Sequence, residues 1–393
     1  MRREGCASMT DAMTVALPAL TRAWRNTGED CLWVRVQTKT SLEVAASAAE
    51  AAMIAANNTE WDTTNGEPRV GGGGTSLTPQ GPVIFVDFCD EASALKSWLT
   101  QVAEELAARG ITGKLLPIRT DAAPIDNENP LTMAAGLTVP IDWAALDHDI
   151  ATLHGAERGW YADPDLTAEL VAELVPWCLF PGDAYLHHQG AQFRITPEQA
   201  EPLLVAALRA GPQVVLTCAT QGGDFQRVDF DLHGQVTLTR RRSGQTWQDD
   251  VASFEQILTD VAPLLEQGLI RRSRRTTSWD SLVNNRLQAA PYGGEGLPLG
   301  LRMTPLRKLF ARRTVDAHGV QVLTDGHLQH AHDLSTWDIQ DLSAGRHLVR
   351  ARDLNPWYTD DQPDAQTLAR ARDDFGDLIL NPTVVKTDLA QLS

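Results

Sequence analysis

The sequence predicts a protein of the α+β class with two or three domains. The chain has 393 residues, which exceeds the size at which one hydrophobic core stops growing. Hydrophobic residues make up 43% of it and charged residues 22%, as in ordinary globular proteins. From Cys31 onward, segments typical of strands alternate with amphipathic segments typical of helices. These three observations together predict a folded chain in which strands and helices are mixed.

A ferredoxin-like domain is predicted for residues 31–119, after a loosely amphipathic lead-in over residues 1–30. Segments rich in β-branched and aromatic residues predict strands at 31–37, 60–64, 82–88 and 114–119. A capping box of Thr40 and Glu43 predicts a helix over 42–56, and an apolar face predicts another between Asp90 and Gly110. The resulting order, strand–helix–strand–strand–helix–strand, is that of the split βαβ arrangement.

Four consecutive glycines, Gly71 to Gly74, precede Thr75 and Ser76. Bare backbone amides of this kind can hold a phosphate group. The lysine of a phosphate-binding loop is missing, however, and no helix is predicted to begin at Thr75. We therefore predict a mobile connection between two strands.

A second α+β domain is predicted for residues 132–268, after a polar linker that contains proline. Its expected strands are 132–141, 184–195, 214–219, 225–232 and 236–242. Its expected helices are 142–153, 166–175, 196–210 and 251–267. His233 and Gly234 fit the tip of a tight hairpin between the last two strands.

Charge is distributed unevenly along the chain, whose net charge is −17. Residues 1–239 hold 15 basic and 31 acidic side chains, residues 240–313 hold 13 and 7, and residues 314–393 hold 6 and 13. We predict a basic connecting region over 269–313. A partner-binding surface is predicted at Arg240, Arg241, Arg242, Arg271, Arg272, Arg274 and Arg275.

This basic surface has three possible uses. It can contact nucleic-acid phosphates, dock an acidic protein segment, or form a contact between domains. Only Trp247 and Trp279 lie nearby as aromatic platforms, and the net charge of −17 would repel a polyanion. A protein contact is therefore favoured over nucleic acid.

The C-terminal module, predicted as α/β over residues 314–393, contains one pattern twice, twenty residues apart. The first copy comprises His327, Leu328, Ala331, Asp333, Leu334 and Trp337. The second comprises His347, Leu348, Ala351, Asp353, Leu354 and Trp357. Thr324 and Asp325 are typical of a helix N-cap before the first copy, whereas the second copy follows the alternation of a strand.

A metal site is one hypothesis for this module. Its candidate ligands for zinc or another divalent ion are His327, His330, His332, His347, Asp333 and Asp353. No single helix or strand brings His327, His330 and His332 to one face, and there is no HExxH motif or nearby cysteine. Packing of the leucines and tryptophans into a core is favoured. Trp337 and Trp357 would anchor a partner only if they were exposed.

Motifs of catalysis are otherwise weak. His187 and His188 lie near Asp183 and Tyr185, but adjacent residues of a strand point to opposite faces, so at most one histidine would serve a site. Asp374-Phe375-Gly376 matches a kinase tripeptide without the catalytic-loop motif that should precede it. We predict no catalytic residues and no cofactor.

Several features indicate the bacterial cytoplasm. The five cysteines are odd in number and widely spaced, as free thiols in a reducing compartment are. No apolar run reaches the roughly 18 residues of a membrane span, and Arg2 and Arg3 are not followed by the apolar segment of a secretory signal. The ratio of 29 arginines to 5 lysines is typical of a GC-rich genome.

The sequence therefore favours a non-enzymatic protein-binding, assembly or neutralising factor. This expectation rests on the missing catalytic motifs, on an acidity that suits basic partners, and on the segregated basic surface. One alternative is a metal-dependent hydrolase that uses the C-terminal histidines. A second is a nucleic-acid-binding protein that uses Arg240 to Arg275.

Overall fold

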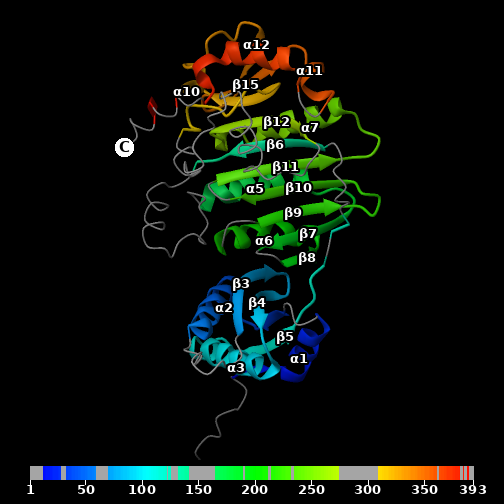
Figure 1. The fold of residues 1–393 in the computed structure, drawn as a ribbon, viewed down its shortest axis with the longest axis vertical. Helices are drawn as coiled ribbons and strands as arrows, with labels where there is room; N and C mark the ends of the chain where they lie inside the picture. The colour runs from blue at the N-terminus through cyan, green and yellow to red at the C-terminus, as the bar shows by residue number, and fades with distance from the viewer. Residues whose placement is uncertain are drawn as a thin grey trace, which may run out of the picture. The chain divides into compact units, whose positions relative to one another are not determined.

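The described residues form a mixed α+β fold with two β-sheets, in agreement with the predicted class (Figure 1). In this computed structural model, the described residues are 12–27, 32–58, 70–121, 123–124, 132–140, 164–188, 191–210, 214–231, 234–273, 309–360, 363–380, 384 and 387–388. The first of two compact units comprises Met1–Ala122 and Tyr185–Gly211, and the second Ala123–Ala184 and Pro212–Ser393. None of the helices in the described ranges combines the length and apolarity that a membrane crossing requires.

The first unit is built on a five-stranded sheet with the strand order β1-β5-β2-β4-β3. The strands are β1 (Met13–Val15), β2 (Leu32–Gln37), β3 (Val70–Thr78), β4 (Gly81–Cys89) and β5 (Gly113–Pro117). The helices are α1 (Leu17–Asn26), α2 (Leu42–Asn57) and α3 (Ala92–Ala108). β1 is parallel to β5, and every other neighbouring pair is antiparallel.

The core of the first unit lies between α2, α3 and one face of this sheet. Leu32, Val34 and Val36 alternate along β2 and are buried there, whereas Trp33 and Arg35 point to the other face. The many alanines of α2 allow it to pack closely against the sheet and α3. The predicted capping box is wrong, because the N-cap of α2 is Ser41 and makes no side-chain hydrogen bond.

The glycine run lies inside strand β3, which corrects its prediction as a connection. Gly72 lies so close to the core that an added Cβ would be 2.5 Å from Met53 Cγ and 3.0 Å from Trp98 Cζ2. The register of the pairing with β4 shifts on either side of Gly72. At this irregularity, the side-chain amide of Asn57 forms hydrogen bonds with the backbone of Gly72. Asn57 Oδ1 accepts the Gly72 N–H at 2.9 Å, and Asn57 Nδ2 donates to the Gly72 carbonyl at 2.8 Å.

The second segment of the first unit contains β8 (Ala191–Ile195) and α6 (Pro197–Ala210), and it begins inside β7 (Asp183–His188). Ala191 and Phe193 pack against Val83 on the face of the sheet that α2 and α3 leave uncovered. The Leu77 N–H donates to Nδ1 of the buried His188 at 3.2 Å. The segment is thereby joined to edge strand β3.

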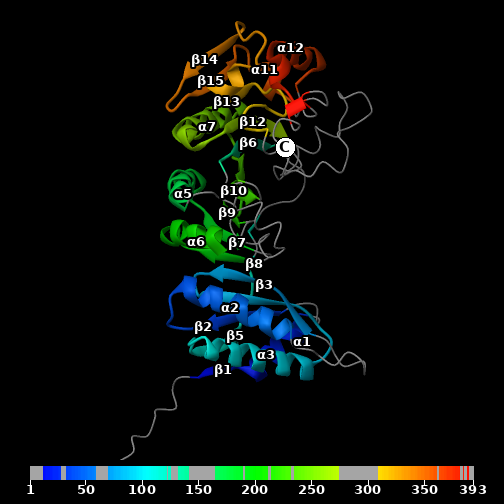
Figure 2. The ribbon, with the colours of Figure 1, turned by 90° about the vertical axis from the view of Figure 1, so that its left-hand side faces the viewer.

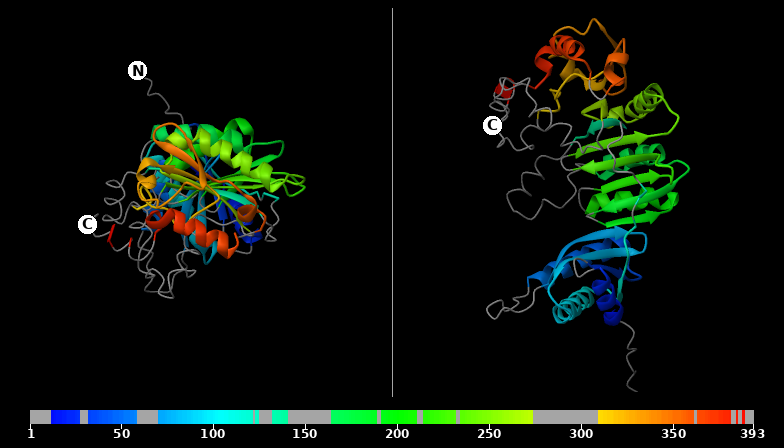
Figure 3. Two further views of the ribbon diagram at one scale, coloured as in Figure 1. Left: turned by 90° about the horizontal axis from the view of Figure 1, so that it is seen from above. Right: turned by 45° about the vertical axis from the view of Figure 1, so that its right-hand side comes forward.

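The other sheet has ten strands in the order β14-β15-β13-β12-β6-β11-β10-β9-β7-β8. Beyond β7 and β8, the strands are β6 (Thr132–Thr138), β9 (Val214–Ala219), β10 (Phe225–Asp231), β11 (Gln235–Arg241), β12 (Gln267–Ser273), β13 (Val320–Thr324), β14 (Trp337–Asp341) and β15 (Arg346–Ala351). The pairings from β14 to β9 are all antiparallel. These strands lie side by side in the right panel of Figure 3.

Helices α5 (Pro164–Cys178) and α7 (Trp247–Asp260) lie along one face of this sheet (Figure 2). The short helices α10 (Asp325–Leu328) and α11 (Asn355–Tyr358) and the longer α12 (Ala365–Phe375) flank its C-terminal strands. β12 pairs with β13, so the strands predicted in the second domain and those predicted in the C-terminal module belong to one continuous sheet. The strand expected at 60–64, the helix expected at 142–153, Arg274, Arg275 and Trp279 lie outside the described residues.

Candidate functional site

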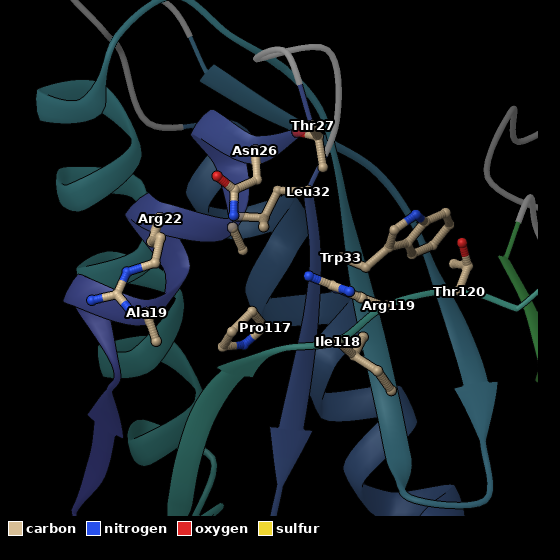
Figure 4. A pocket seen from close by; sticks show the side chains of 11 residues that line it. Ala19, Arg22, Asn26, Thr27, Leu32, Trp33, Pro117, Ile118, Arg119 and Thr120 are labelled. Carbon is tan, nitrogen blue, oxygen red and sulfur yellow. The ribbon is translucent and has the colours of Figure 1, made fainter.

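A cavity of about 560 Å³ opens in the first unit between α1 and the ends of β2 and β5 (Figure 4). Its volume falls within the range of roughly 300–1,000 Å³ that is typical of ligand sites. The lining residues are Ala19, Arg22, Ala23, Asn26, Thr27, Leu32, Trp33, Pro117, Ile118, Arg119 and Thr120. None of these described residues is a carboxylate, a histidine or a cysteine, so the lining supports binding better than acid–base or nucleophilic chemistry.

One wall of the pocket is helix α1, which lies in the segment predicted only as a lead-in. Leu20 and Trp24 are four residues apart and anchor one face of α1 in the core. Ala19, Arg22 and Asn26 lie at helical spacing on another face and line the cavity. These two spacings, together with Pro18 at the start of the helix, are the sequence features by which this wall could have been found.

The opposite wall is formed by Trp33 and the chain that follows β5. The Trp33 ring stacks on Phe85, with centroids 4.4 Å apart and an interplanar angle of 28°. The Ile118 N–H donates to the Trp33 carbonyl at 3.1 Å, which extends the pairing of the strands beyond Pro117. Trp33 and Ile118 also pack against Phe193 and its neighbours, so this apolar wall is fixed in place.

Two arginines contribute positive charge to the pocket from its two sides. Arg22 lies on α1 and Arg119 follows Ile118, as Figure 4 shows. Within the described part of the chain, neither guanidinium makes a hydrogen bond or an ion pair, and both side chains are exposed. The Asn26 amide adds further hydrogen-bond donors. An apolar wall next to such donors suits a ligand that carries both an apolar group and an anion.

The predicted basic surface is engaged within the second unit. Arg240 is 8% exposed, and its Nε lies 3.2 Å from Asp250 Oδ1. The Arg242 guanidinium lies 3.5 Å from the centroid of the Phe180 ring. Arg272 donates to the carbonyls of Tyr358 and Thr359. Arg240, Arg242 and Arg272 therefore contact acceptors or rings within the second unit, and partner binding by this surface stays a prediction.

Burial also shifts the pKa values of the charged groups in this network. Desolvation raises the pKa of Asp250 to about 6, although the neighbouring Arg240 opposes the change. Desolvation likewise lowers the pKa of Arg240, and Asp250 opposes this. Arg240 and Arg272 face the same residue, Met133 of β6, from its two sides, which explains why both influence the carboxyl group of Asp250.

The histidines of the C-terminal module are separate from one another in their contacts. His327 is fully buried, with Nε2 donating to the Phe310 carbonyl at 2.9 Å and Nδ1 accepting the Thr324 N–H at 3.2 Å. Burial lowers its pKa to about 4. His347 Nε2 lies 2.7 Å from Asp325 Oδ1, and its Nδ1 lies 2.9 Å from Asp341 Oδ1.

The other candidate metal ligands have local roles. Asp333 accepts the Ser335 N–H, Asp353 accepts the Asn355 N–H, and His332 contacts the Asp373 carbonyl. Desolvation lowers the pKa of the half-buried His330. In the described ranges, no three histidine, cysteine or acidic side chains are gathered as a metal site requires. The zinc-dependent hydrolase therefore remains a hypothesis without support from this geometry.

The two copies of the repeated pattern adopt different structures. His327 lies in helix α10 and His347 in strand β15, whereas Trp337 begins a strand and Trp357 lies in helix α11. Both indoles are buried, with ring centroids 5.9 Å apart, and Trp337 Nε1 donates to Asp374 Oδ2 at 3.0 Å. Such burial leaves little indole surface for a partner.

Comparisons with known proteins identify no family for this chain. No family model matches it, and no curated protein matches it significantly. Among solved structures, it is similar to the Pseudomonas aeruginosa T6SS protein PA0821, at 13% identity over 64% of this chain and 76% of that chain, with a TM-score of 0.33. So low a TM-score does not establish a shared fold, and we infer nothing about function from it.

Proposed function

We propose that this protein is a non-enzymatic protein-binding factor whose first unit captures a segment of another protein in the α1 pocket. The observation that carries the proposal is a cavity with an apolar wall and two arginines that no described residue neutralises. Among the described residues, Arg22 and Arg119 have no partner that would compete with an incoming anion. The predicted assembly and neutralising roles are both forms of this binding activity.

The proposed occupant is a peptide segment with an apolar side chain next to a carboxylate. Trp33 offers an aromatic surface that is already held by Phe85, so its burial costs little side-chain entropy. A guanidinium binds a carboxylate through two parallel hydrogen bonds, which gives both affinity and orientation. Arg119 lies directly after Ile118 and can pair with a carboxylate beside an apolar group that contacts Trp33 and Ile118.

We further propose that the first unit is a ferredoxin-like domain with an N-terminal addition. The order β2–α2–β3–β4–α3–β5 and the antiparallel arrangement β5-β2-β4-β3 support this assignment. The addition consists of β1 and α1, which supply one wall of the pocket. The proposed compartment is the bacterial cytoplasm, supported by the buried thiols of Cys89, Cys178 and Cys218.

Selection from a phage-displayed library of random peptides tests the binding proposal. We expect the wild-type protein to enrich peptides in which an acidic residue neighbours an aliphatic or aromatic one. Binding of a selected peptide should weaken at least 10-fold in the Arg119→Glu and Trp33→Ala variants. Lys114→Glu is the matched control, because Lys114 is exposed on β5 but does not line the cavity. Failure to enrich any peptide, or equal binding by Arg119→Glu and Lys114→Glu, would contradict the proposal.

A further inference from the structure

Strand β14 forms one end of the ten-stranded sheet and pairs only with β15 on its inner side. Its outer side faces no other described strand, and Figure 2 shows it next to β15 at the limit of the sheet. An unpaired strand edge presents backbone N–H and carbonyl groups to which another strand can bind. This edge lies in the second unit and is independent of the pocket proposed above.

The register identifies which backbone groups of β14 have no ladder partner among the described residues. The Leu342 N–H donates to the Arg346 carbonyl at 2.8 Å, next to the pairs Asp341–His347 and Gln340–Leu348. Hydrogen-bonded and non-hydrogen-bonded pairs alternate in an antiparallel ladder. Asp338 and Gln340 therefore bond to β15, whereas Ile339 and Asp341 direct their N–H and carbonyl groups outward.

The side chains of β14 are also accessible. Ile339 is 45% exposed, which is unusual for a large apolar side chain among the described residues. The side chains of Asp338 and Asp341 are 59% and 87% exposed, and the strand carries no basic residue. Asp338 pairs with Arg352, and Asp341 Oδ1 lies 2.9 Å from His347 Nδ1, but both carboxylates remain open to solvent, where such contacts are weak.

We propose that β14 accepts an extended segment of a partner protein that alternates basic and apolar residues. Ile339 would contact an apolar side chain of the added strand on one face of the sheet, and Asp338 would pair with one of its cations on the opposite face. A second copy of β14 is a poor occupant, because antiparallel self-pairing would bring four carboxylates close together. Residues 314–393 hold 13 acidic and 6 basic side chains, and this negative charge favours the approach of a basic segment.

Amide hydrogen exchange resolved by NMR tests this proposal on the full-length protein. The probes are acetyl-(Lys-Val)₃-amide and its acidic counterpart, acetyl-(Glu-Val)₃-amide, each at millimolar concentration. The basic peptide should slow exchange of the Ile339 and Asp341 amides at least 10-fold and leave Asp338 and Gln340 unchanged. No slowing, or equal slowing by the acidic peptide, would overturn the proposal and leave the acidic edge as protection against aggregation.

Reversing the charge of the two aspartates on β14 is the second test of the proposal. The double variant Asp338→Lys/Asp341→Lys should lose at least 10-fold in affinity for the basic peptide and gain affinity for the acidic one. Asp360→Lys/Asp373→Lys changes the net charge equally but lies off the strand, so it should bind like the wild type. Equal losses of affinity in both double variants would show that the net charge of the protein determines binding, which would contradict the assignment to β14. If the reversed strand does not fold, Ile339→Pro removes both an outward N–H and the apolar contact of Ile339, and it should lower the affinity at least 10-fold.

Discussion

Two neighbouring arginines, Arg241 at the end of β11 and Arg242 directly after it, differ in the contacts of their side chains. Arg242 stacks on Phe180, and its Nε donates to Gln226 Oε1 at 2.9 Å. Gln226 in turn donates to the Trp177 carbonyl, which links β11 to the end of α5. Arg241 precedes Arg242, and its side chain makes no hydrogen bond or ion pair with a described residue. The network therefore assigns a structural role to Arg242 and not to Arg241.

Alanine substitutions separate these roles. Arg242→Ala removes a stacked guanidinium and leaves the buried Gln226 oxygen without its donor, so it should lower the free energy of unfolding by about 1–3 kcal/mol. Arg241→Ala should change it by no more than about 0.5 kcal/mol. Urea unfolding monitored by circular dichroism measures both. Similar effects of the two substitutions would show that the cluster is not the internal network described above.

Strand β3 shows how tertiary packing can override local composition. Four glycines in a row have a low intrinsic preference for strands. Here Met53 and Trp98 occupy the space next to Gly72, and the Phe88 ring occupies the space next to Gly71. Larger residues at these positions would displace the core and the aromatic side chains of β4.

Gly72→Ala is expected to destabilise the first unit by about 1–3 kcal/mol through overpacking. Gly222→Ala is the control, because its added Cβ would have only Thr220 Oγ1 nearby, at 3.6 Å. That substitution should change stability by no more than about 0.5 kcal/mol. Thermal unfolding gives both values, and a Gly72→Ala protein as stable as the wild type would refute the close packing of β3.

Periodic segments were predicted well, and positions that depend on distant contacts were not. The apolar faces of α2 and α3 and the N-cap at Thr324 follow from local spacing and were expected. The pocket was missed because Trp33, Arg119 and α1 come together only through the pairing of β1, β2 and β5. The internal partners of Arg242 and Arg272 were hidden for the same reason, since the sequence does not show which carbonyls or rings they contact.

At the scale of the whole molecule, two buried histidines make stability depend on pH. Burial lowers the pKa of His188 and of His327 to about 4. Each Nδ1 accepts a backbone N–H, from Leu77 and from Thr324, and only a neutral imidazole can do so. The unfolded chain takes up these protons near pH 6.5. Their stabilisation is therefore complete above about pH 6.5 and is lost as the pH falls toward 4.

The wild-type protein should lose about 2–3 kcal/mol more stability than His188→Gln between pH 7 and pH 4.5. The comparison isolates His188, because the titrations of the carboxylates are common to both proteins. His332→Gln serves as the control, since His332 is exposed, and it should follow the wild type. Urea unfolding at the two pH values measures the difference. Parallel losses in the wild type and His188→Gln would contradict a neutral, buried imidazole.

Binding of a protein segment in the α1 pocket of the first unit can be measured by hydrogen exchange with mass spectrometry. The experiment compares the full-length protein with and without a peptide selected on it. We predict slower exchange in α1 and in residues 117–120 around Arg119, with no change in these segments for the Arg119→Glu variant. Protection confined to the second unit, or unchanged exchange at saturating peptide, would contradict the claim.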